Sequence, residues 1–529
     1  MKNKYIYIAI IAAGFTSCEP EFENPVVADY SAGEANFSSY VALGNSLTAG
    51  YMDGTMYKSG QANSFPKLLS QQFALVGGGA FTQPSYEDDV NNLGGIAGLT
   101  GTRLIIDASQ GRPEPIAGTS TIMLTAQNTA YNNMGVPGAK SFHLLAPGYG
   151  NPAGLATGQA NPYFVRHAVN QATSTVLGDA MIKNPTFFTN WIGANDILSY
   201  ATSGGTRPDN PFTTTVDESL LPATDQTGNP NPASYGGNDI TDPAFFQGAY
   251  SQIINTLTSN GAKGVVATIP SVTSIPYFTT VPYAPLSPTA LGGATNVAAL
   301  NAQLYGPLNG IFTAYGEPDR VQLLSATAAN PLLIYDEDAV DRSAQIAGAL
   351  TPSLGAPTAA AFGAVFGKAR QAKATDLVVL TASSIIGTPN ASSPSTMINL
   401  NGVSYPMPSK WVLTSTEQAK VAAATTAYNA SIKAIAASKD LAIADMNAIL
   451  NQLVNGLKAD NGTLYTANYF AGGTSEFKVL FSLDGVHPNA RGYSVIANEI
   501  IKVINTHYNA KLPLLNPNNY TGINILPIN

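Results

Sequence analysis

Ser46 occupies a place in the chain where a serine side chain could act as a nucleophile. It follows the stretch 39–43, which predicts a short buried strand, and it stands in the turn Gly-Asn-Ser-Leu-Thr-Ala-Gly. A turn anchored to a buried strand holds its side chain in one direction, out of the sheet. Such a serine becomes a useful nucleophile when a base and an orienting acid reach it.

His487 is the best candidate for that base among the four histidines. Asp484 precedes it by three residues in Ser-Leu-Asp-Gly-Val-His-Pro, so one turn can bring the carboxylate to the imidazole and fix its tautomer. The same Asp-x-x-His-Pro pattern also suits the start of a helix. His143 and His167 fall in predicted helices. His507 lies near the end of the last helix, where a favourable interaction with the helix dipole is enough to explain a histidine.

A serine nucleophile also needs hydrogen-bond donors for the charge that develops on the carbonyl oxygen. The candidates for this oxyanion hole are the backbone N–H of Ser46, the backbone N–H of Gly138 and the side-chain amide of Asn195. Each of the last two also has a plainer interpretation. Gly138 could be an ordinary turn glycine, and Asn195 could cap the helix that follows it.

Strand-like apolar runs alternate with helical patterns along the chain, which predicts a parallel sheet covered on both faces. Predicted strands end directly before Ser46, Gly138 and Asn195, and functional groups gather at the carboxyl ends of parallel strands. The fold class is therefore α/β, and the candidate residues are expected at one edge of the sheet.

Two further segments matter for the organisation of the chain. The stretch 162–182 is predicted to form one long helix. The stretch 276–410 is less regular, and we interpret it as a large insertion beside the site that shapes the pocket. The aromatic and proline-rich run 275–286 could line an apolar acyl site there.

Four motifs in order give the sequence a family resemblance. They are Gly-Asn-Ser-Leu at 44–47, Asn-x-Gly-x-x-Gly at 133–138, Gly-Ala-Asn-Asp at 193–196 and Asp-x-x-His-Pro at 484–488. Together they resemble the SGNH/GDSL family of serine hydrolases. The segment 267–276 also looks like the family's fourth block.

The resemblance implies a flavodoxin-like three-layer α/β/α fold with a parallel central sheet. It implies a catalytic triad of Ser46, His487 and Asp484, an oxyanion hole of Ser46, Gly138 and Asn195, and no metal or cofactor. The family's usual aspartate before the serine is Asn45 here, a position without a catalytic role in the family. No Gly-x-Ser-x-Gly elbow of the α/β-hydrolase type surrounds the serine.

The function expected from this resemblance is hydrolysis of carboxylic esters, as a lipolytic or general esterase. The substrate would be a small-molecule, lipid or glycan ester. One alternative is a carbohydrate acetylesterase that acts on a polysaccharide. An alternative from another class is a non-catalytic surface lipoprotein that binds glycan on an inactive hydrolase scaffold.

Composition excludes several other classes. The chain has 529 residues with a net charge of −8 and no basic run, which argues against nucleic acid as a partner. The acidic clusters 87–89 and 336–338 lack the spacing of a calcium loop, and neither a P-loop nor a His-Glu-x-x-His motif occurs. We therefore expect no metal and no cofactor.

The N-terminus has the pattern of an exported protein. Residues 1–17 combine a basic start with a short apolar stretch, as in a signal peptide, and Cys18 is the only cysteine of the chain. This end resembles a bacterial lipobox, in which the cysteine is lipidated, and the acidic residues after it resemble the export signal of Bacteroidetes surface lipoproteins. We expect a tether at 18–36, a hydrolase domain at 37–529, and a lipid anchor in the cell envelope, most simply in the outer membrane.

Overall fold

The computed structural model of the chain describes residues 29–107, 112–208, 221–459, 462–468, 478–523 and 525–526. The expected signal peptide 1–17 and the lipidation site Cys18 lie outside these residues, so both stay predictions. Among the described residues, no helix combines the length and apolar character that crossing a membrane requires.

A five-stranded sheet, in which every neighbouring pair of strands is parallel, forms the centre of the molecule. The prediction of an α/β fold with a parallel central sheet is confirmed. The spatial order is β11-β6-β5-β1-β4, so the strands, counted along the chain, lie in the order 5-4-3-1-2. The order reverses between β1 and β5, which is where parallel sheets of this kind bind their ligands. The strands are β1 (Tyr40–Gly44), β4 (Asn133–Gly135), β5 (Phe187–Trp191), β6 (Lys263–Ala267) and β11 (Ala442–Ala444).

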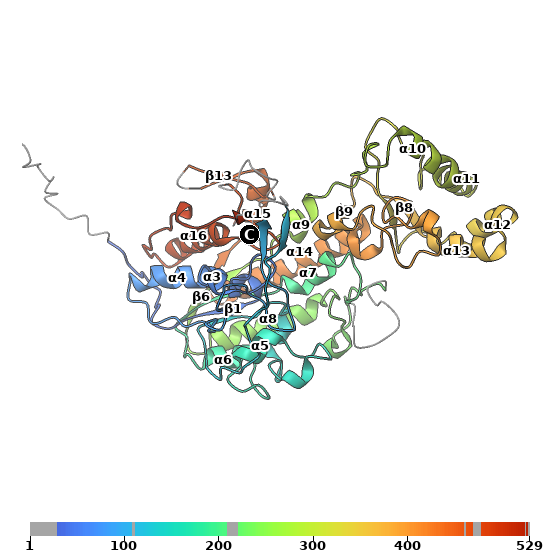
Figure 1. Ribbon diagram of the computed structural model, residues 1–529. Coiled ribbons are helices and arrows are strands. Elements are labelled where there is room, and N and C mark those ends of the chain that lie inside the picture. The colour runs from blue at the N-terminus through green and yellow to red at the C-terminus, as the bar shows by residue number, and fades with distance from the viewer. Residues whose placement is uncertain are drawn as a thin grey trace, which may run out of the picture.

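Helices bury both faces of the sheet because alternate side chains of each strand point to opposite faces. Tyr40 and Ala42 of β1 pack into a core with α4 and α16, whereas Val41 and Leu43 pack into a core with α6, α8 and α14. Figure 1 shows α4 and α16 on one side of β1 and β6, and α5, α6 and α8 on the other. The helices around the sheet are α2 (Ser46–Ala49), α3 (Lys58–Gln61), α4 (Phe65–Ala74), α5 (Pro162–His167), α6 (Val176–Met181), α7 (Asn195–Thr202), α8 (Pro243–Leu257), α14 (Ser415–Ser438), α15 (Met446–Asn455) and α16 (Ala490–His507).

The prediction of one long helix over 162–182 is wrong, because α5 and α6 are separated there. Between them the buried carboxylate of Asp179 accepts hydrogen bonds from the Val169 N–H at 2.9 Å and the Ser174 hydroxyl at 2.7 Å. The Thr175 side chain then caps α6 by accepting from the Gly178 N–H. Short polar side chains therefore satisfy the backbone here in place of a continuous helix.

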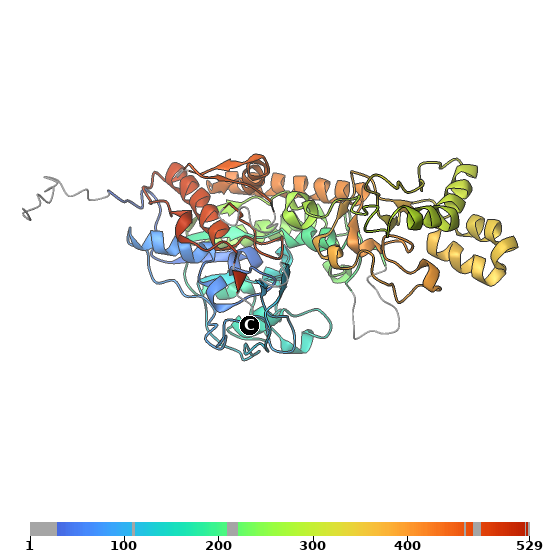
Figure 2. The ribbon, with the colours of Figure 1, turned by 45° about the horizontal axis from the view of Figure 1, so that its top comes forward.

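The segment 276–410 forms a lobe that extends away from the sheet (Figure 1). Figure 2 shows α14 running from the sheet toward this lobe. The helices of the lobe are α9 (Pro276–Thr279), α10 (Ala294–Leu300), α11 (Gly306–Ala314), α12 (Ser343–Leu354) and α13 (Ala356–Phe366). Two antiparallel pairs support them, namely β7 (Leu333–Tyr335) with β8 (Ala369–Gln371), and β9 (Leu377–Val378) with β10 (Val412–Leu413). Smaller pairings elsewhere join β2 (Leu104–Asp107) to β3 (Pro113–Pro115) and β14 (Ile525–Leu526), and β12 (Leu457–Lys458) to β13 (Leu464–Tyr465).

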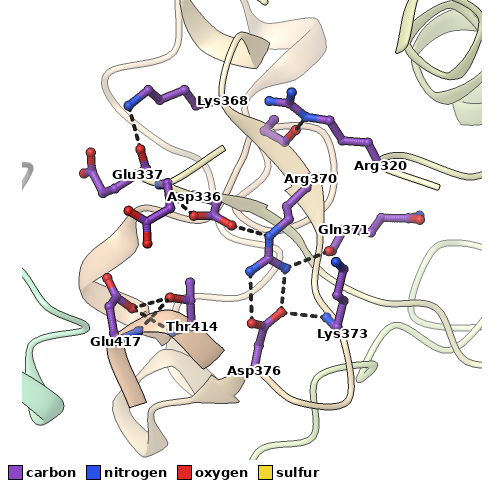
Figure 3. Close-up of polar contacts among 12 residues, drawn as sticks. Arg320, Asp336, Glu337, Lys368, Arg370, Gln371, Lys373, Asp376, Thr414 and Glu417 are labelled. Carbon is purple, nitrogen blue, oxygen red and sulfur yellow. Dashed lines mark hydrogen bonds and ion pairs between the residues drawn. The ribbon is translucent and has the colours of Figure 1, made fainter. Parts of the chain in front are cut away.

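A buried arginine organises the base of this lobe. The guanidinium of Arg370 forms a bidentate pair with Asp376, at 2.6 and 3.0 Å, and a further ion pair with Asp336 (Figure 3). Arg370 is 8% exposed and Asp376 is 4% exposed, so removal of either partner would leave a buried charge without its counterion. The acidic cluster 336–338 is thus partly an internal structural element, rather than a wholly solvated surface run.

The predicted tether does not extend to residue 36. The Lys511 N–H donates to the Ser31 carbonyl at 2.8 Å, and the Glu34 N–H donates to the Tyr508 carbonyl at 2.8 Å. Ala35 and Phe37 are buried in the core beside α16. The globular part therefore already includes residue 31, because the C-terminal segment supplies hydrogen-bond partners that the sequence around residue 30 does not reveal.

Candidate active site

Close packing at the end of β1 fixes Ser46 at the carboxyl edge of the sheet. Gly44 must be glycine, because a β-carbon there would lie 2.1 Å from the Thr48 hydroxyl oxygen and 2.5 Å from the Trp191 carbonyl oxygen. Asn45 then caps α2 by accepting a hydrogen bond from the Leu47 N–H at 3.1 Å. Ser46 is the first residue of that short helix.

His487 and Asp484 complete a continuous hydrogen-bonded relay with Ser46. The Nε2 atom of His487 lies 2.8 Å from the Ser46 Oγ, and its Nδ1 atom lies 2.8 Å from the Asp484 Oδ2. The Asp484 Oδ1 accepts the backbone N–H groups of Val486 and His487, at 2.9 and 2.8 Å, which closes the turn and aims the carboxylate at the ring. The structure thus brings together the three residues that the sequence singles out as nucleophile, base and acid.

The environment keeps the Asp484 carboxylate ionised. Burial would raise its pKa, but the charge and hydrogen bonds of His487, together with the Val486 N–H, outweigh that effect and lower the pKa below its usual value. The Gly54 N–H and the Ser482 hydroxyl also donate to this carboxylate, at 3.1 and 3.0 Å. An ionised acid at this place orients His487 with a proton on Nδ1, which leaves Nε2 free to accept the proton of Ser46.

Two of the three candidate oxyanion donors lie with the relay at one cavity. Ser46, Asn195 and His487 line the same cavity, whereas Gly138 is not among the described residues that line it. Gly138 has φ +80° and precedes Ala139, whose carbonyl accepts a hydrogen bond from the Asn195 amide at 3.0 Å. The N–H groups of Ser46 and Gly138 have no hydrogen-bond acceptor among the described residues. Both are therefore available as donors.

A buried network behind these donors holds their loops together. The Asp196 carboxylate accepts the backbone N–H and the hydroxyl of Ser141, both at 2.8 Å. The Lys140 ammonium donates to the Asp239 carbonyl at 2.7 Å, and burial lowers its pKa. The loop after β4 is thereby tied to the start of α7, where Asn195 stands. The motif at 193–196 includes Asp196, but no sequence feature indicates its contact with Ser141.

Asp53 is a site residue that the sequence analysis missed. Its carboxylate accepts hydrogen bonds from the Leu483 N–H at 3.0 Å and the Tyr57 hydroxyl at 2.7 Å, and its own N–H donates to the Ser482 hydroxyl oxygen at 3.0 Å. Burial raises the pKa of Asp53 to about 6. Asp53 therefore clamps the turn that carries Asp484, and no motif around it signals this role.

The remaining histidines are structural. His143 and His167 lie in helical segments, as expected; His167 is buried and His143 is half-buried, and desolvation lowers the pKa of each, to about 3 for His143. The His143 Nδ1 accepts the Lys140 N–H at 3.1 Å. His507 ends α16 and its Nε2 lies 3.1 Å from the Asp440 carbonyl oxygen. In the ranges that the structure describes, no group of three or more His, Cys, Asp or Glu side chains is placed to hold a metal ion.

The cavity beside Ser46 has a volume of about 110 Å³ and mostly apolar walls. Of the aromatic and proline-rich run 275–286, only Ile275 lines it, and none of the lining residues comes from 276–410. The expectation that the insertion shapes this pocket is therefore wrong. The insertion instead contacts the turn between Asp484 and His487, since the Tyr277 N–H at its start donates to the Gly485 carbonyl at 2.9 Å.

Comparisons with known proteins leave the site to be interpreted from its own geometry. No family model, curated protein or solved structure matches this chain. The functional argument therefore rests on the relay of Ser46, His487 and Asp484, on the donors beside it and on the cavity.

Proposed function

We propose that this protein is a serine esterase that hydrolyses carboxylic esters through an acyl-enzyme on Ser46. The observation that carries the proposal is the uninterrupted relay from Asp484 through His487 to Ser46, with 2.8 Å at each contact of the imidazole. A hydroxyl, an imidazole and a carboxylate in this order form the general arrangement for nucleophilic catalysis by serine.

In the first half of the reaction, the Ser46 Oγ attacks the ester carbonyl carbon while His487 Nε2 takes the hydroxyl proton. Asp484 holds the ring and stabilises the imidazolium that results. The carbonyl oxygen gains negative charge, and we assign its stabilisation to the N–H groups of Ser46 and Gly138 and to the second N–H of the Asn195 amide. The tetrahedral intermediate then collapses, His487 gives its proton to the alcohol oxygen, and the alcohol leaves.

In the second half, His487 removes a proton from a water molecule, and the hydroxide that forms attacks the acyl carbon. The same donors stabilise the second tetrahedral intermediate. Its collapse returns the proton to the Ser46 oxygen and releases the carboxylic acid. The step needs no oxidant, reductant or cofactor, because the bonds that break and form balance with one molecule of water.

We also propose membership of the SGNH/GDSL hydrolases, with the flavodoxin-like three-layer architecture of that family. Two observations support this proposal. The four sequence motifs occur in the family's order, and the core strands, counted along the chain, have the spatial order 2-1-3-4-5 when read from the β4 edge, as in flavodoxin-like sheets.

Replacement of the nucleophile tests the proposed function. Ser46→Ala removes the Oγ but leaves the backbone N–H and the helix start in place, so the fold should persist. We expect hydrolysis of 4-nitrophenyl acetate and 4-nitrophenyl butanoate to fall by a factor of roughly 10³ or more, with an unchanged thermal midpoint. Ser199→Ala, a change to a half-buried serine on α7, serves as the matched control. Wild-type turnover by Ser46→Ala would contradict the assignment.

A further inference from the structure

The cavity beside Ser46 has one wall made by a single short helix. Met446, Ile449, Leu450 and Leu453 of α15 all line it. Their spacing of three and four residues places them on one face of the helix. Val454, the next residue, is 50% exposed and does not line the cavity. The inner face of α15 thus contacts the cavity, and its outer face contacts solvent.

Three of the five polar side chains at this cavity belong to the proposed catalytic machinery. Besides the Trp191 indole, the lining side chains that carry nitrogen or oxygen are those of Asn45, Ser46, Asn195 and His487. Apart from the proposed catalytic groups, a sugar or glycerol group in the cavity would find only the Asn45 amide and the Trp191 indole as side-chain partners, so burial of its several hydroxyls is costly. An apolar chain would instead gain a factor of roughly four in affinity for each methylene group that it buries.

The walls distinguish the two parts of an ester. The alcohol parts of acetylated glycans and of monoacylglycerols carry several hydroxyls, whereas acyl chains longer than acetyl are apolar. An acyl group on the Ser46 Oγ, with its carbonyl oxygen toward Asn195, has its chain beside the apolar wall, because both residues border the cavity. The position of the apolar cavity beside the nucleophile therefore matches an acyl chain.

We propose, resting on the esterase function above, that this cavity is the acyl-binding site and that α15 sets the preferred chain length. A cavity of about 150 Å³ holds the six carbons of benzene, so the volume of about 110 Å³ here corresponds to about four carbons beyond the carbonyl carbon. The preferred substrates are accordingly esters of acids with roughly four to six carbons, and not acetylated polysaccharides.

A panel of 4-nitrophenyl esters from acetate to decanoate tests the chain-length preference. We expect kcat/KM for hexanoate to exceed that for acetate by roughly tenfold or more. A profile that is highest at acetate would overturn the inference. In that case, loss of acetate hydrolysis in Ser46→Ala would show that the esterase function itself stands. Absence of Ser46-dependent turnover of every ester would instead contradict the function on which the inference rests.

Substitutions at two adjacent residues of α15 test the role of the helix. Leu453→Trp fills the cavity and should reduce kcat/KM for hexanoate by roughly tenfold or more while acetate hydrolysis changes less than about twofold. Val454→Trp adds the same bulk on the solvent side and should leave both rates unchanged. Leu453→Ala enlarges the cavity and should move the optimum to longer acids, so the test survives if the tryptophan variant does not fold. Equal effects on acetate and hexanoate in both Leu453 variants would contradict the proposal.

A second substrate series tests whether the cavity binds the acyl chain or the alcohol part of the ester. A series of alkyl acetates keeps the acyl group constant while the alcohol grows from ethyl to hexyl. We expect little change in kcat/KM along this series for the wild type, and no effect of Leu453→Trp on it. A steep rise with alcohol length that Leu453→Trp abolishes would place the alcohol in the cavity and overturn the assignment to the acyl chain.

Discussion

At the scale of single residues, the position of His487 depends on a small turn that is fixed from two directions. Within the turn, the backbone N–H groups of Val486 and His487 donate to the Asp484 carboxylate. From outside the turn, the Asp53 carboxylate accepts the Leu483 N–H at 3.0 Å. Asp53 also has φ +52°, which asparagine and aspartate tolerate better than other non-glycine residues. We therefore infer that Asp53 is a positioning residue that acts through the turn that carries Asp484 and His487.

Substitution of Asp53 should affect the chemical step more than substrate binding. Asp53→Ala leaves the Leu483 N–H and the Tyr57 hydroxyl without their acceptor, and we expect kcat to fall by roughly 10–100-fold with KM nearly unchanged. Asp53→Asn keeps one acceptor oxygen and the backbone preference, and should restore most of kcat. Steady-state kinetics on 4-nitrophenyl butanoate check both values. A kcat for Asp53→Ala equal to that of the wild type would show that the clamp has no role.

The sequence predicted Ser46, Asp484 and His487 because each carries a local signal: a glycine-bounded turn after a strand, or a three-residue spacing. Asp53 has no such signal. Its partner Leu483 lies 430 residues away, and only the folded chain brings the two together. Gly138 and Asn195 are intermediate cases. In the sequence, a turn glycine and a helix cap explain these residues as well as a role in an oxyanion hole does. Only the sheet order shows that the strands before them lie on either side of β1.

At the scale of elements, α14 links the sheet to the lobe and begins with a buried carboxylate. Glu417 forms a capping box with Thr414, in which Oε2 accepts the Thr414 N–H at 2.7 Å (Figure 3). Burial raises the pKa of Glu417 to about 7 from 4.5. The folded chain then binds this proton more tightly than the unfolded chain, so its contribution to stability is lost as the pH rises from about 4.5 to 7.

Glu417→Gln should remove this pH dependence, because glutamine keeps the capping oxygen and cannot ionise. We expect the variant to match the wild type near pH 4.5 and to be more stable at pH 8, by a free energy of unfolding on the order of 1–3 kcal/mol. Urea unfolding at several pH values measures the difference. Glu417→Ala, which loses the cap, should be less stable than Glu417→Gln at every pH. Parallel stability curves for the wild type and Glu417→Gln would contradict this account.

Elements with a strong apolar period could be predicted from the sequence, and those that end through local polar contacts could not. Four of the five core strands coincide with short apolar runs, whereas β4, which spans only Asn133–Gly135, lies in the mixed stretch 128–138 that ends in a glycine turn. The break between α5 and α6 was missed because it depends on the buried carboxylate of Asp179, which replaces helical hydrogen bonds with side-chain ones.

At the scale of the whole molecule, the lobe and the cavity are separate features. The sequence could show that 276–410 interrupts the pattern of strands and helices, but not that it would contact the turn that carries Asp484 and His487. In the structure its first residues contact that turn, and α15 lines the cavity. The substrate preference is therefore expected to depend on α15 and not on the lobe.

The most direct measurement for the central claim is covalent labelling of Ser46. A fluorophosphonate reacts with an activated serine, with loss of fluoride and formation of a phosphorus–oxygen bond. Incubation with this probe followed by peptide mass spectrometry should show one label per chain on Ser46, no label in Ser46→Ala, and strongly slowed labelling in His487→Ala. Absence of labelling in the folded wild-type protein, or undiminished labelling in Ser46→Ala, would contradict the proposal that Ser46 is a catalytic nucleophile.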